Sequence, residues 1–222
     1  MPENGSDQAL QMATLLSANL HDTKNLMGQL MLRLDALSGD DPGVRDARFL
    51  CQQVNDRMVQ LLLLFEVRDG ELKPQYEAHN PEDFLLELRE NARAWAGERL
   101  RIEMRDDAAP DYWYFDRTLL EMAMMNALHN AFRHARQEII LSAGMHDGML
   151  QLSVSDDGAG YPQGILHSAG DERLPVSQDG TGLGLFFAGK IANAHNNRGV
   201  RGRLKLDNAS SGGGAVFSIL LP

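Results

Sequence analysis

The chain has 222 residues, 43% of them hydrophobic, which is enough for one large domain or two small domains with buried cores. Its formal net charge of −10 disfavours attraction to nucleic acid phosphates or to anionic lipid. Cys51 is the single cysteine, so an intramolecular disulfide and a thiolate-rich metal site are excluded, and a reducing cytosol fits best.

The N-terminal stretch is polar and lacks the layout of a signal peptide. We expect residues 1–9 to form a flexible N-terminus. No apolar run approaches the roughly 20 residues that a membrane-spanning helix needs. The sequence therefore predicts a cytoplasmic protein with neither a membrane nor a nucleic acid partner.

Residues 10–70 have the pattern of an antiparallel helical hairpin. Apolar positions recur at alternating steps of four and three, as in a helix that buries one stripe. Turn-forming residues at 38–43, with Pro42 suited to a first helical turn, separate two such stripes. The first stripe is Leu16, Leu20, Thr23, Met27, Leu30, Leu34 and Leu37, and the second is Val44, Ala47, Cys51, Val54, Met58, Leu61 and Phe65.

Such a hairpin cannot bury both of its stripes alone. Pairing with a second copy would enclose them in a four-helix bundle. We therefore expect a homodimer.

Residues 71–222 alternate between helical and extended patterns, which predicts a second domain with one sheet covered on one face by helices. The overall fold class is thus α+β, with a two-layer α/β sandwich after the hairpin. The expected helices are 82–95, 119–135 and 183–194, and the expected strands are 100–104, 112–115, 138–143, 149–155, 204–206 and 216–221.

Three motifs in this second domain suggest a nucleotide site. Asn126 and Asn130 lie four residues apart in a predicted helix, so their amide oxygens share one face and could bind a hard cation such as magnesium. The alternative for two such asparagines is a solvated surface.

The second motif, Asp156-Asp-Gly158-Ala-Gly160, follows an apolar strand. A carboxylate there could accept a hydrogen bond from the amine of adenine, and the glycines would let the backbone approach the base. An ordinary turn is the alternative.

The third motif is Gly180-Thr181-Gly182-Leu183-Gly184, directly before a predicted helix. Free N–H groups at a helix start favour an anion such as a triphosphate. A plain glycine hinge is the alternative.

Taken in order with the ending at residues 212–222, these motifs resemble the N, G1 and G2 boxes and the final strand of bacterial sensor histidine kinases. The resemblance covers about residues 74–222 and implies the histidine kinase ATPase (Bergerat) fold with ATP and Mg²⁺ as cofactors. It implies that Asn130 is the main magnesium ligand with support from Asn126, and that Asp156 reads adenine. The other implied nucleotide contacts are Arg133, His134, Gly158, Gly160, Gly180, Thr181, Gly182, Leu183 and Gly184.

Relatives that hydrolyse ATP usually carry a glutamate general base where this chain has Asn126. An amide cannot take a proton. The site is therefore expected to hold ATP for another nucleophile.

That nucleophile is predicted in the hairpin, where His21-Asp22-Thr23-Lys24-Asn25 resembles the H box of the same kinases. A largely neutral His21 imidazole can attack phosphorus, and Asp22 could orient it or take its proton. Asn25, one turn later, could position water against a phosphoaspartate on a docked partner. The alternative is that these are ordinary exposed helix residues.

The chain departs from the family pattern at three places. Leu26 stands where many H boxes have proline, Asn196 stands where glycine is common, and the phenylalanine-containing F box is missing between Gly160 and Gly180. These departures leave the nucleotide contacts in place and the autokinase rate open.

The sequence thus favours a histidine kinase core that phosphorylates His21 and passes the phosphoryl group to a response regulator receiver domain, with a signal from a separate sensor protein or from further parts of a longer chain. The alternative is a phosphotransfer protein or response-regulator phosphatase with a weak or regulatory ATP domain. A serine kinase of a sigma-factor antagonist is a third reading, but it has little use for the histidine.

Overall fold

The computed structural model describes residues 22–23, 25–34, 43–44, 47–48, 50–55, 58, 72–96, 100–168, 183–209 and 213–222. The chain divides into two compact units, Met1–Glu71 and Leu72–Pro222. Among the helices in these residues, none is both long and apolar enough to cross a lipid bilayer.

The described part of the first unit is helical, including residues 25–34 and 50–55. The Arg48 guanidinium donates a hydrogen bond to the Leu34 carbonyl oxygen at 2.7 Å, which joins the two sides of the predicted turn. Large apolar side chains are exposed in both stretches, among them Leu26, Leu30 and Leu50. The complete hairpin and its dimer remain predictions, because much of each helix lies outside the described residues.

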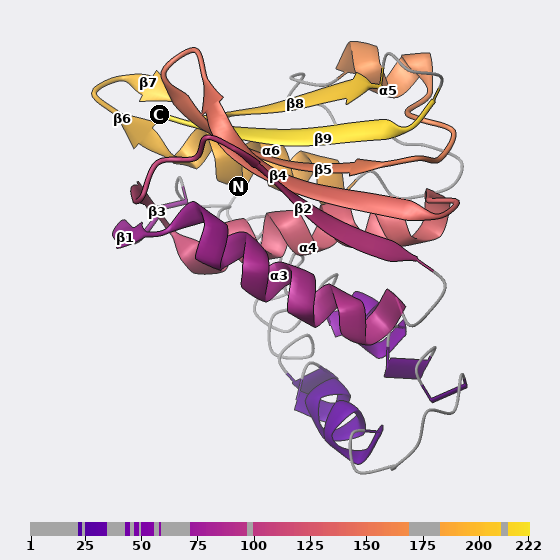
Figure 1. Cartoon of the computed structure of the whole chain (residues 1–222). Helices are drawn as coiled ribbons and strands as arrows, with labels where there is room; N and C mark the ends of the chain where they lie inside the picture. Colours follow the sequence, from indigo (N-terminus) through magenta and orange to yellow (C-terminus); the bar gives the residue numbers. More distant parts are fainter. Residues whose placement is uncertain are drawn as a thin grey trace, which may run out of the picture. The chain divides into compact units, whose positions relative to one another are not determined.

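The second unit is built on a five-stranded sheet in the order β2-β4-β5-β9-β8 (Figure 1). Only the pair β2 and β4 is parallel, and the other neighbours are antiparallel. The strands are β2 (Arg101–Asp107), β4 (Glu138–His146), β5 (Met149–Asp156), β8 (Arg203–Asn208) and β9 (Ala215–Leu221). This mixed sheet confirms the predicted α+β class for the second unit.

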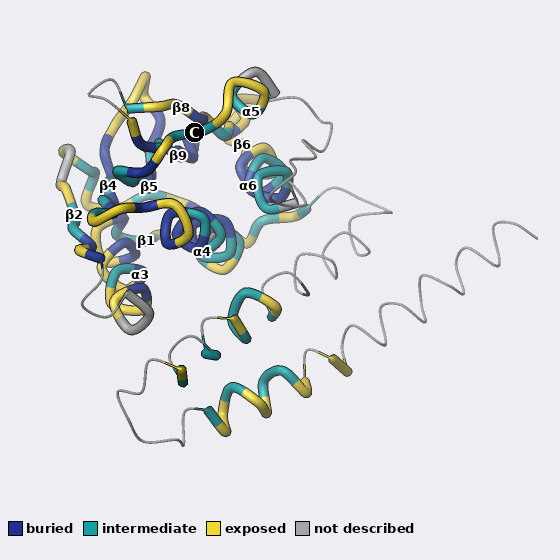
Figure 2. Tube along the Cα trace, turned by 90° about the vertical axis from the view of Figure 1, so that its right-hand side faces the viewer, coloured by how far each residue is buried: buried dark blue, intermediate teal, exposed yellow. Residues whose placement is uncertain are grey.

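Three helices cover one face of this sheet, namely α3 (Pro81–Ala96), α4 (Arg117–His134) and α6 (Leu183–Ala194). Period-two burial along β4, with Ile139, Leu141 and Ala143 all buried, supplies apolar side chains to that face. Figure 2 shows the buried residues gathered on these strands and helices. The two layers therefore enclose one hydrophobic core.

Four short elements were not predicted from the sequence. Strand β1 (Glu77–His79) is one of them, and it pairs with β3 (Trp113–Phe115), which agrees with the strand predicted at 112–115. Helix α5 (Gln163–Ser168) follows the second motif, and β6 (Asn196–Asn197) pairs with β7 (Val200–Arg201). Each is too short to display a period of its own.

The sheet has two distinct ends. Strand β5 runs toward Asp156 and β9 runs back antiparallel, so Ser155 pairs with Val216 and Leu150 with Leu221. Asp156 and Pro222 consequently lie at opposite ends of the sheet. The motifs of the sequence belong to the Asp156 end.

Candidate functional site

Helix α4 presents the two asparagines on a stripe that stays accessible. Asp116 caps the helix, because its Oδ1 accepts a hydrogen bond from the Leu119 N–H at 3.0 Å. Asn126 and Asn130 are half-buried while the residues between them are buried. Arg133 and His134 are exposed in the last turn of the same helix. One helix thus displays two amides and two basic side chains.

Asp156 ends β5 with its carboxylate held by backbone groups. Oδ1 accepts hydrogen bonds from the N–H of Gly158 at 2.8 Å and of Ala215 at 3.3 Å. Both of these backbone hydrogen bonds are made to Oδ1. One oxygen therefore fixes the carboxylate, and the other remains available to a ligand amine.

Asp157 ties this turn to the end of α4. Its carboxylate accepts hydrogen bonds from the Arg136 N–H at 2.7 Å and the Gln137 N–H at 3.0 Å. Burial pushes the pKa of Asp157 upward, but the backbone donors, with Gln137 first, outweigh it and hold the pKa below its usual value. The carboxylate is ionised near neutral pH and clamps α4 beside β5.

Close backbone approach explains two of the glycines. A Cβ on Gly158 would lie 2.4 Å from the His134 carbonyl oxygen, so only glycine fits beside the end of α4. Gly214 has φ +113° and its Cβ would lie 2.1 Å from the Asp156 carbonyl oxygen. These contacts bring the start of β9 and the end of α4 against the Asp156 turn.

The loop after Gly160 is held by Asn208 at the end of β8. The Asn208 Oδ1 accepts from the Tyr161 N–H at 2.6 Å, and its Nδ2 donates to the Tyr161 carbonyl at 3.0 Å. Burial and the negative charge of Asp156 raise the pKa of the Tyr161 phenol. Tyr161 is therefore a neutral aromatic side chain near the Asp156 carboxylate.

Helix α6 begins directly beside Asn126. A Cβ on Gly184, the second residue of α6, would lie 2.2 Å from Nδ2 and 2.4 Å from Oδ1 of Asn126. The first N–H groups of a helix have no partner within the helix and favour an anion. The anion-favouring start of α6 and the amide stripe of α4 thus meet at one point.

The amide oxygens where α4 meets the start of α6 are suited to bind magnesium together with phosphates. The described residues contain no group of three or more His, Cys, Asp or Glu side chains that could hold a metal alone. Mg²⁺ typically takes few protein ligands and completes its shell with phosphate oxygens and water. The Asn126 and Asn130 amide oxygens suit that mode, and buried His129, whose pKa burial lowers to about 4, adds no charge.

The structure brings together most of the predicted nucleotide contacts that it describes. Asn126 and Gly184 touch through the close approach above, and the Asp156 turn packs on the end of the same α4. Asp22 and Asn25 are exposed and helical in the first unit. The predicted residues His21, Gly180, Thr181 and Gly182 lie outside the described part, and so does the burial of Leu183.

Several contributing residues were not predicted. Asp157 looks like a plain turn residue in the sequence, and nothing local relates Asn208 to Tyr161. The positive φ angles of Gly213 and Gly214 were signalled by the run of glycines before the last strand.

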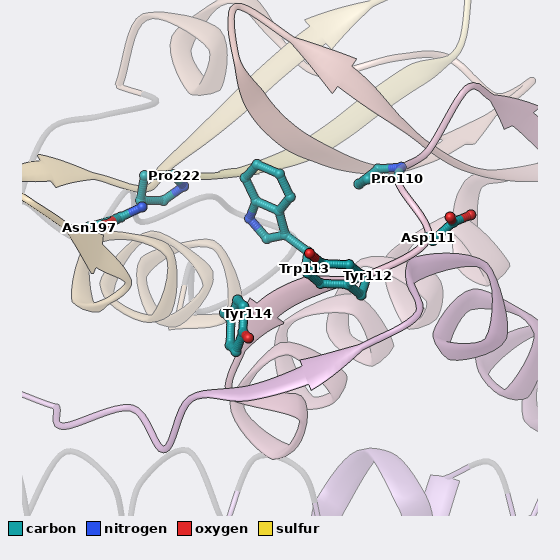
Figure 3. Close-up of a pocket in the computed structure, with 7 residues that line it drawn as sticks. All are labelled: Pro110, Asp111, Tyr112, Trp113, Tyr114, Asn197 and Pro222. Atoms are coloured by element: carbon teal, nitrogen blue, oxygen red, sulfur yellow. The ribbon is translucent and has the colours of Figure 1, made fainter.

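A cavity of about 480 Å³ lies at the other end of the sheet, beside Pro222 (Figure 3). Pro110, Tyr112, Trp113 and Tyr114 line it together with Asp111 and Asn197. Its lining consists mainly of aromatic and proline side chains and contains no basic side chain for phosphates. This cavity is therefore distinct from the site that the motifs form.

A mixed sheet with helices on one face, and with amides, a backbone-held carboxylate and a helix start gathered at one end, defines an ATPase-type α+β domain. Residues 115–222 match the model of the family described as "Histidine kinase-, DNA gyrase B-, and HSP90-like ATPase". This part of the chain is therefore similar to that family.

Curated relatives and a solved structure extend the likeness. The sensory histidine kinase/phosphatase NtrB of Rhodobacter capsulatus is 28% identical over 241 residues, covering 100% of this chain and 64% of the relative. NtrB of Azospirillum brasilense is 27% identical over 213 residues, covering 86% of this chain and 52% of the relative. The chain thus spans only part of their length.

Full-length ShkA, solved in complex with AMPPNP, superposes with a TM-score of 0.66 at 20% identity. The match covers 94% of this chain and 45% of that protein. At this identity the likeness concerns the fold. Together with the relatives and the family match, it confirms the resemblance to a sensor histidine kinase transmitter core with an ATPase domain.

Proposed function

We propose that this chain is the kinase core of a two-component signalling system, which binds Mg-ATP in the second unit and phosphorylates His21. The observation that carries the proposal is the contact of Gly184 with Asn126, because it joins the helix start suited to phosphates with the amides suited to magnesium. The similarity of residues 115–222 to the ATPase family and the names of the relatives support it.

Each part of the site would hold one part of the nucleotide. The Oδ2 atom of Asp156 would accept a hydrogen bond from the adenine amine, since Oδ1 is occupied by backbone donors. The N–H groups that begin α6 would face the phosphates, with Arg133 and His134 nearby on α4. Asn130 and Asn126 would hold Mg²⁺, which supplies neutralisation of the phosphate charge during transfer.

The proposed transfer uses the first unit as acceptor. An imidazole nitrogen of His21 attacks the γ-phosphorus, a P–N bond forms, and the bond to the β,γ-bridging oxygen breaks to release ADP. Asp22 takes up or orients the imidazole proton. A carboxylate oxygen of an aspartate on a response regulator then attacks the same phosphorus and the P–N bond breaks.

The site is also expected to hydrolyse ATP slowly. The amide of Asn126 cannot accept a proton, so it cannot serve as a general base toward a water molecule. Hydrolysis by the isolated second unit should therefore be slow compared with labelling of the intact chain.

Incubation with γ-labelled ATP and Mg²⁺ tests the proposal. The intact chain should take up label that is labile to acid and stable to alkali, and His21→Gln should take up none. His146→Gln, which changes an exposed histidine of β4, is the matched control and should label like the parent chain. Equal labelling of His21→Gln and the parent would refute the acceptor assignment.

A phosphatase activity is the second candidate. Asn25 is exposed on a helix one turn from His21, and the two NtrB relatives are named kinase/phosphatase. We expect the chain to speed the loss of phosphate from a phosphorylated receiver domain. Asn25→Ala should lose this effect and keep autophosphorylation, whereas loss of both activities would argue against a separate role for Asn25.

The proposed functional form is a homodimer through the first unit. Leu30, which belongs to the predicted apolar stripe, is 44% exposed, and a partner helix would bury it. Sedimentation should give twice the mass of one chain. A stable monomer at micromolar concentration would contradict the bundle.

A further inference from the structure

A buried histidine joins α6 to α4 at the end opposite Gly184. His195 follows α6 directly and is 1% exposed. Its Nε2 accepts a hydrogen bond from the Asp116 N–H at 3.0 Å, and its Nδ1–H donates to the Ile191 carbonyl oxygen at 2.8 Å. Both ring nitrogens are thus used, and the two bonds require the neutral tautomer with the proton on Nδ1.

Asp116 connects this histidine to the segment that enters the second unit. Its Oδ1 caps α4, and its Oδ2 accepts a hydrogen bond from the Gln75 N–H at 2.8 Å. The Tyr76 ring stands edge-on to His195, with ring centroids 5.6 Å apart, and the Tyr76 hydroxyl oxygen accepts from the Asn196 N–H at 2.7 Å. Residues 75–76 therefore contact both the start of α4 and the end of α6.

The distances along the two helices match. Asp116 and Asn126 are ten residues apart on α4, and Gly184 and His195 are eleven apart on α6, so at 1.5 Å per residue both separations are about 15–17 Å. The two helices are joined by His195 and Asp116 at one end and by Gly184 and Asn126 at the other. Because helices move as nearly rigid rods, a slide of α6 along α4 changes both junctions together.

We propose that His195 is a positioning residue for the nucleotide site, and that Tyr76 couples residues 72–76 to that site through His195. The inference rests on the proposed function, because the site it positions is the Mg-ATP site. Loss of the His195–Asp116 bond frees the end of α6 and loosens the contact between Gly184 and Asn126, although His195 itself touches no part of the nucleotide.

The test measures two quantities on the intact chain. His195→Leu removes the acceptor for the Asp116 N–H, and its dissociation constant for Mg-ATP is expected to rise about five- to tenfold, the scale of one hydrogen bond. Without nucleotide, amide hydrogen exchange at residues 187–190, whose N–H groups can bond within α6, should speed up. His195→Gln, which keeps a side-chain acceptor and a donor, should restore a large part of both.

Ile102→Val is the matched control, since it trims a buried side chain of β2 away from α6. It should lower stability without changing either quantity. Tyr76→Phe keeps the ring and removes only the hydroxyl, so it provides a variant at a half-exposed position that keeps the fold if His195→Leu unfolds. It should weaken Mg-ATP binding about two- to fivefold.

The outcomes separate this inference from the proposed function. If the parent chain binds no Mg-ATP, the proposed function fails, and the exchange at residues 187–190 still decides the coupling. Unchanged exchange and unchanged affinity in folded His195→Leu, or in Tyr76→Phe when His195→Leu does not fold, would overturn the role of His195 as a positioning residue. Faster exchange in the variants but not in Ile102→Val would support it.

Discussion

The two ends of the α4–α6 pair are built from different chemistry. At the Gly184 end, glycine backbone meets a side-chain amide, and the neighbouring Asp156 carboxylate is held by the N–H groups of Gly158 and Ala215. At the His195 end, the buried imidazole is hydrogen-bonded to the residue that caps α4, and the Tyr76 ring packs edge-on against it. The first end leaves donors and acceptors for a ligand, whereas the second uses them internally.

The comparison also shows that cavity volume does not identify the site. The cavity of about 480 Å³ adjoins the His195 end, where Asn197 follows Asn196 and Tyr114 lies two residues before Asp116. Its aromatic lining cannot neutralise a triphosphate. The chemistry at the Gly184 end can do so, because it combines amide oxygens, a helix start and basic side chains.

Loss of Asn130, the proposed main magnesium ligand, should give the largest effect. Asn130→Ala removes an amide that helps to position phosphate charge, and we expect the rate of labelling by ATP to fall about 100-fold. Asn91→Ala changes an exposed asparagine of α3 and is the control. Equal rates for the two variants would remove α4 from the nucleotide site.

Replacing Gly158 by alanine should destabilise the domain, whereas the same replacement at Gly189 on α6 should not. A Cβ on Gly158 would strike the His134 backbone oxygen, so Gly158→Ala should cost about 1–3 kcal/mol in the free energy of unfolding. Gly189, within α6, has open space for a Cβ, and Gly189→Ala should stabilise by about 0.5–1 kcal/mol. Urea unfolding measures both, and a similar sign for both would contradict the described packing.

Gly184→Ala should separate function from stability. The added Cβ meets the end of the Asn126 side chain, which can turn away, rather than backbone. We expect Mg-ATP affinity to fall about tenfold, because the displaced amide can no longer take its place in the site. The unfolding free energy should change by less than about 0.5 kcal/mol. Calorimetric titration with unchanged affinity would show that Asn126 has no part in binding.

The His195 end should respond to acid. Burial lowers the pKa of His195 below its ordinary value, while the Ile191 carbonyl and the Asp116 charge partly oppose this, so the unfolded chain binds the proton more readily. The stability that this histidine contributes is complete above its unfolded pKa near 6.5 and is lost as pH falls toward the folded pKa.

The slope due to this one group is at most about 1.4 kcal/mol per pH unit. Urea unfolding at pH 7.5 and 5.5 should show a larger decrease in the parent chain than in His195→Gln. The exposed His146→Gln should behave like the parent. An equal decrease in the parent and His195→Gln would mean that His195 is not held neutral.

Much of this architecture follows from local pattern. The bounds of α6 agree with the prediction because Gly180 and Gly182 precede it and its apolar period ends at His195. The end of β5 at Asp156 follows from an apolar run that stops at two carboxylates. The three motifs proposed for the nucleotide are compact, and their order along the chain resembles the histidine kinase boxes, which is how they were recognised.

The remaining features depend on contacts between distant segments. The bond between Asp116 and His195 joins residues 79 positions apart, so no window of sequence displays it. The pairing of Asn208 with Tyr161 and of β1 with β3 is equally nonlocal. The parallel pairing of β2 with β4 depends on the connection through β3 and α4, which lie between them in the chain.

The most direct test of the central claim is amide hydrogen exchange of the intact chain with and without Mg-ATP, compared at the two ends. Nucleotide should protect residues 126–137, 156–161 and 183–187, and should leave residues 110–115 and 219–222 nearly unchanged. Protection of the aromatic cavity beside Trp113, with none at Asp156 or the start of α6, would contradict the account.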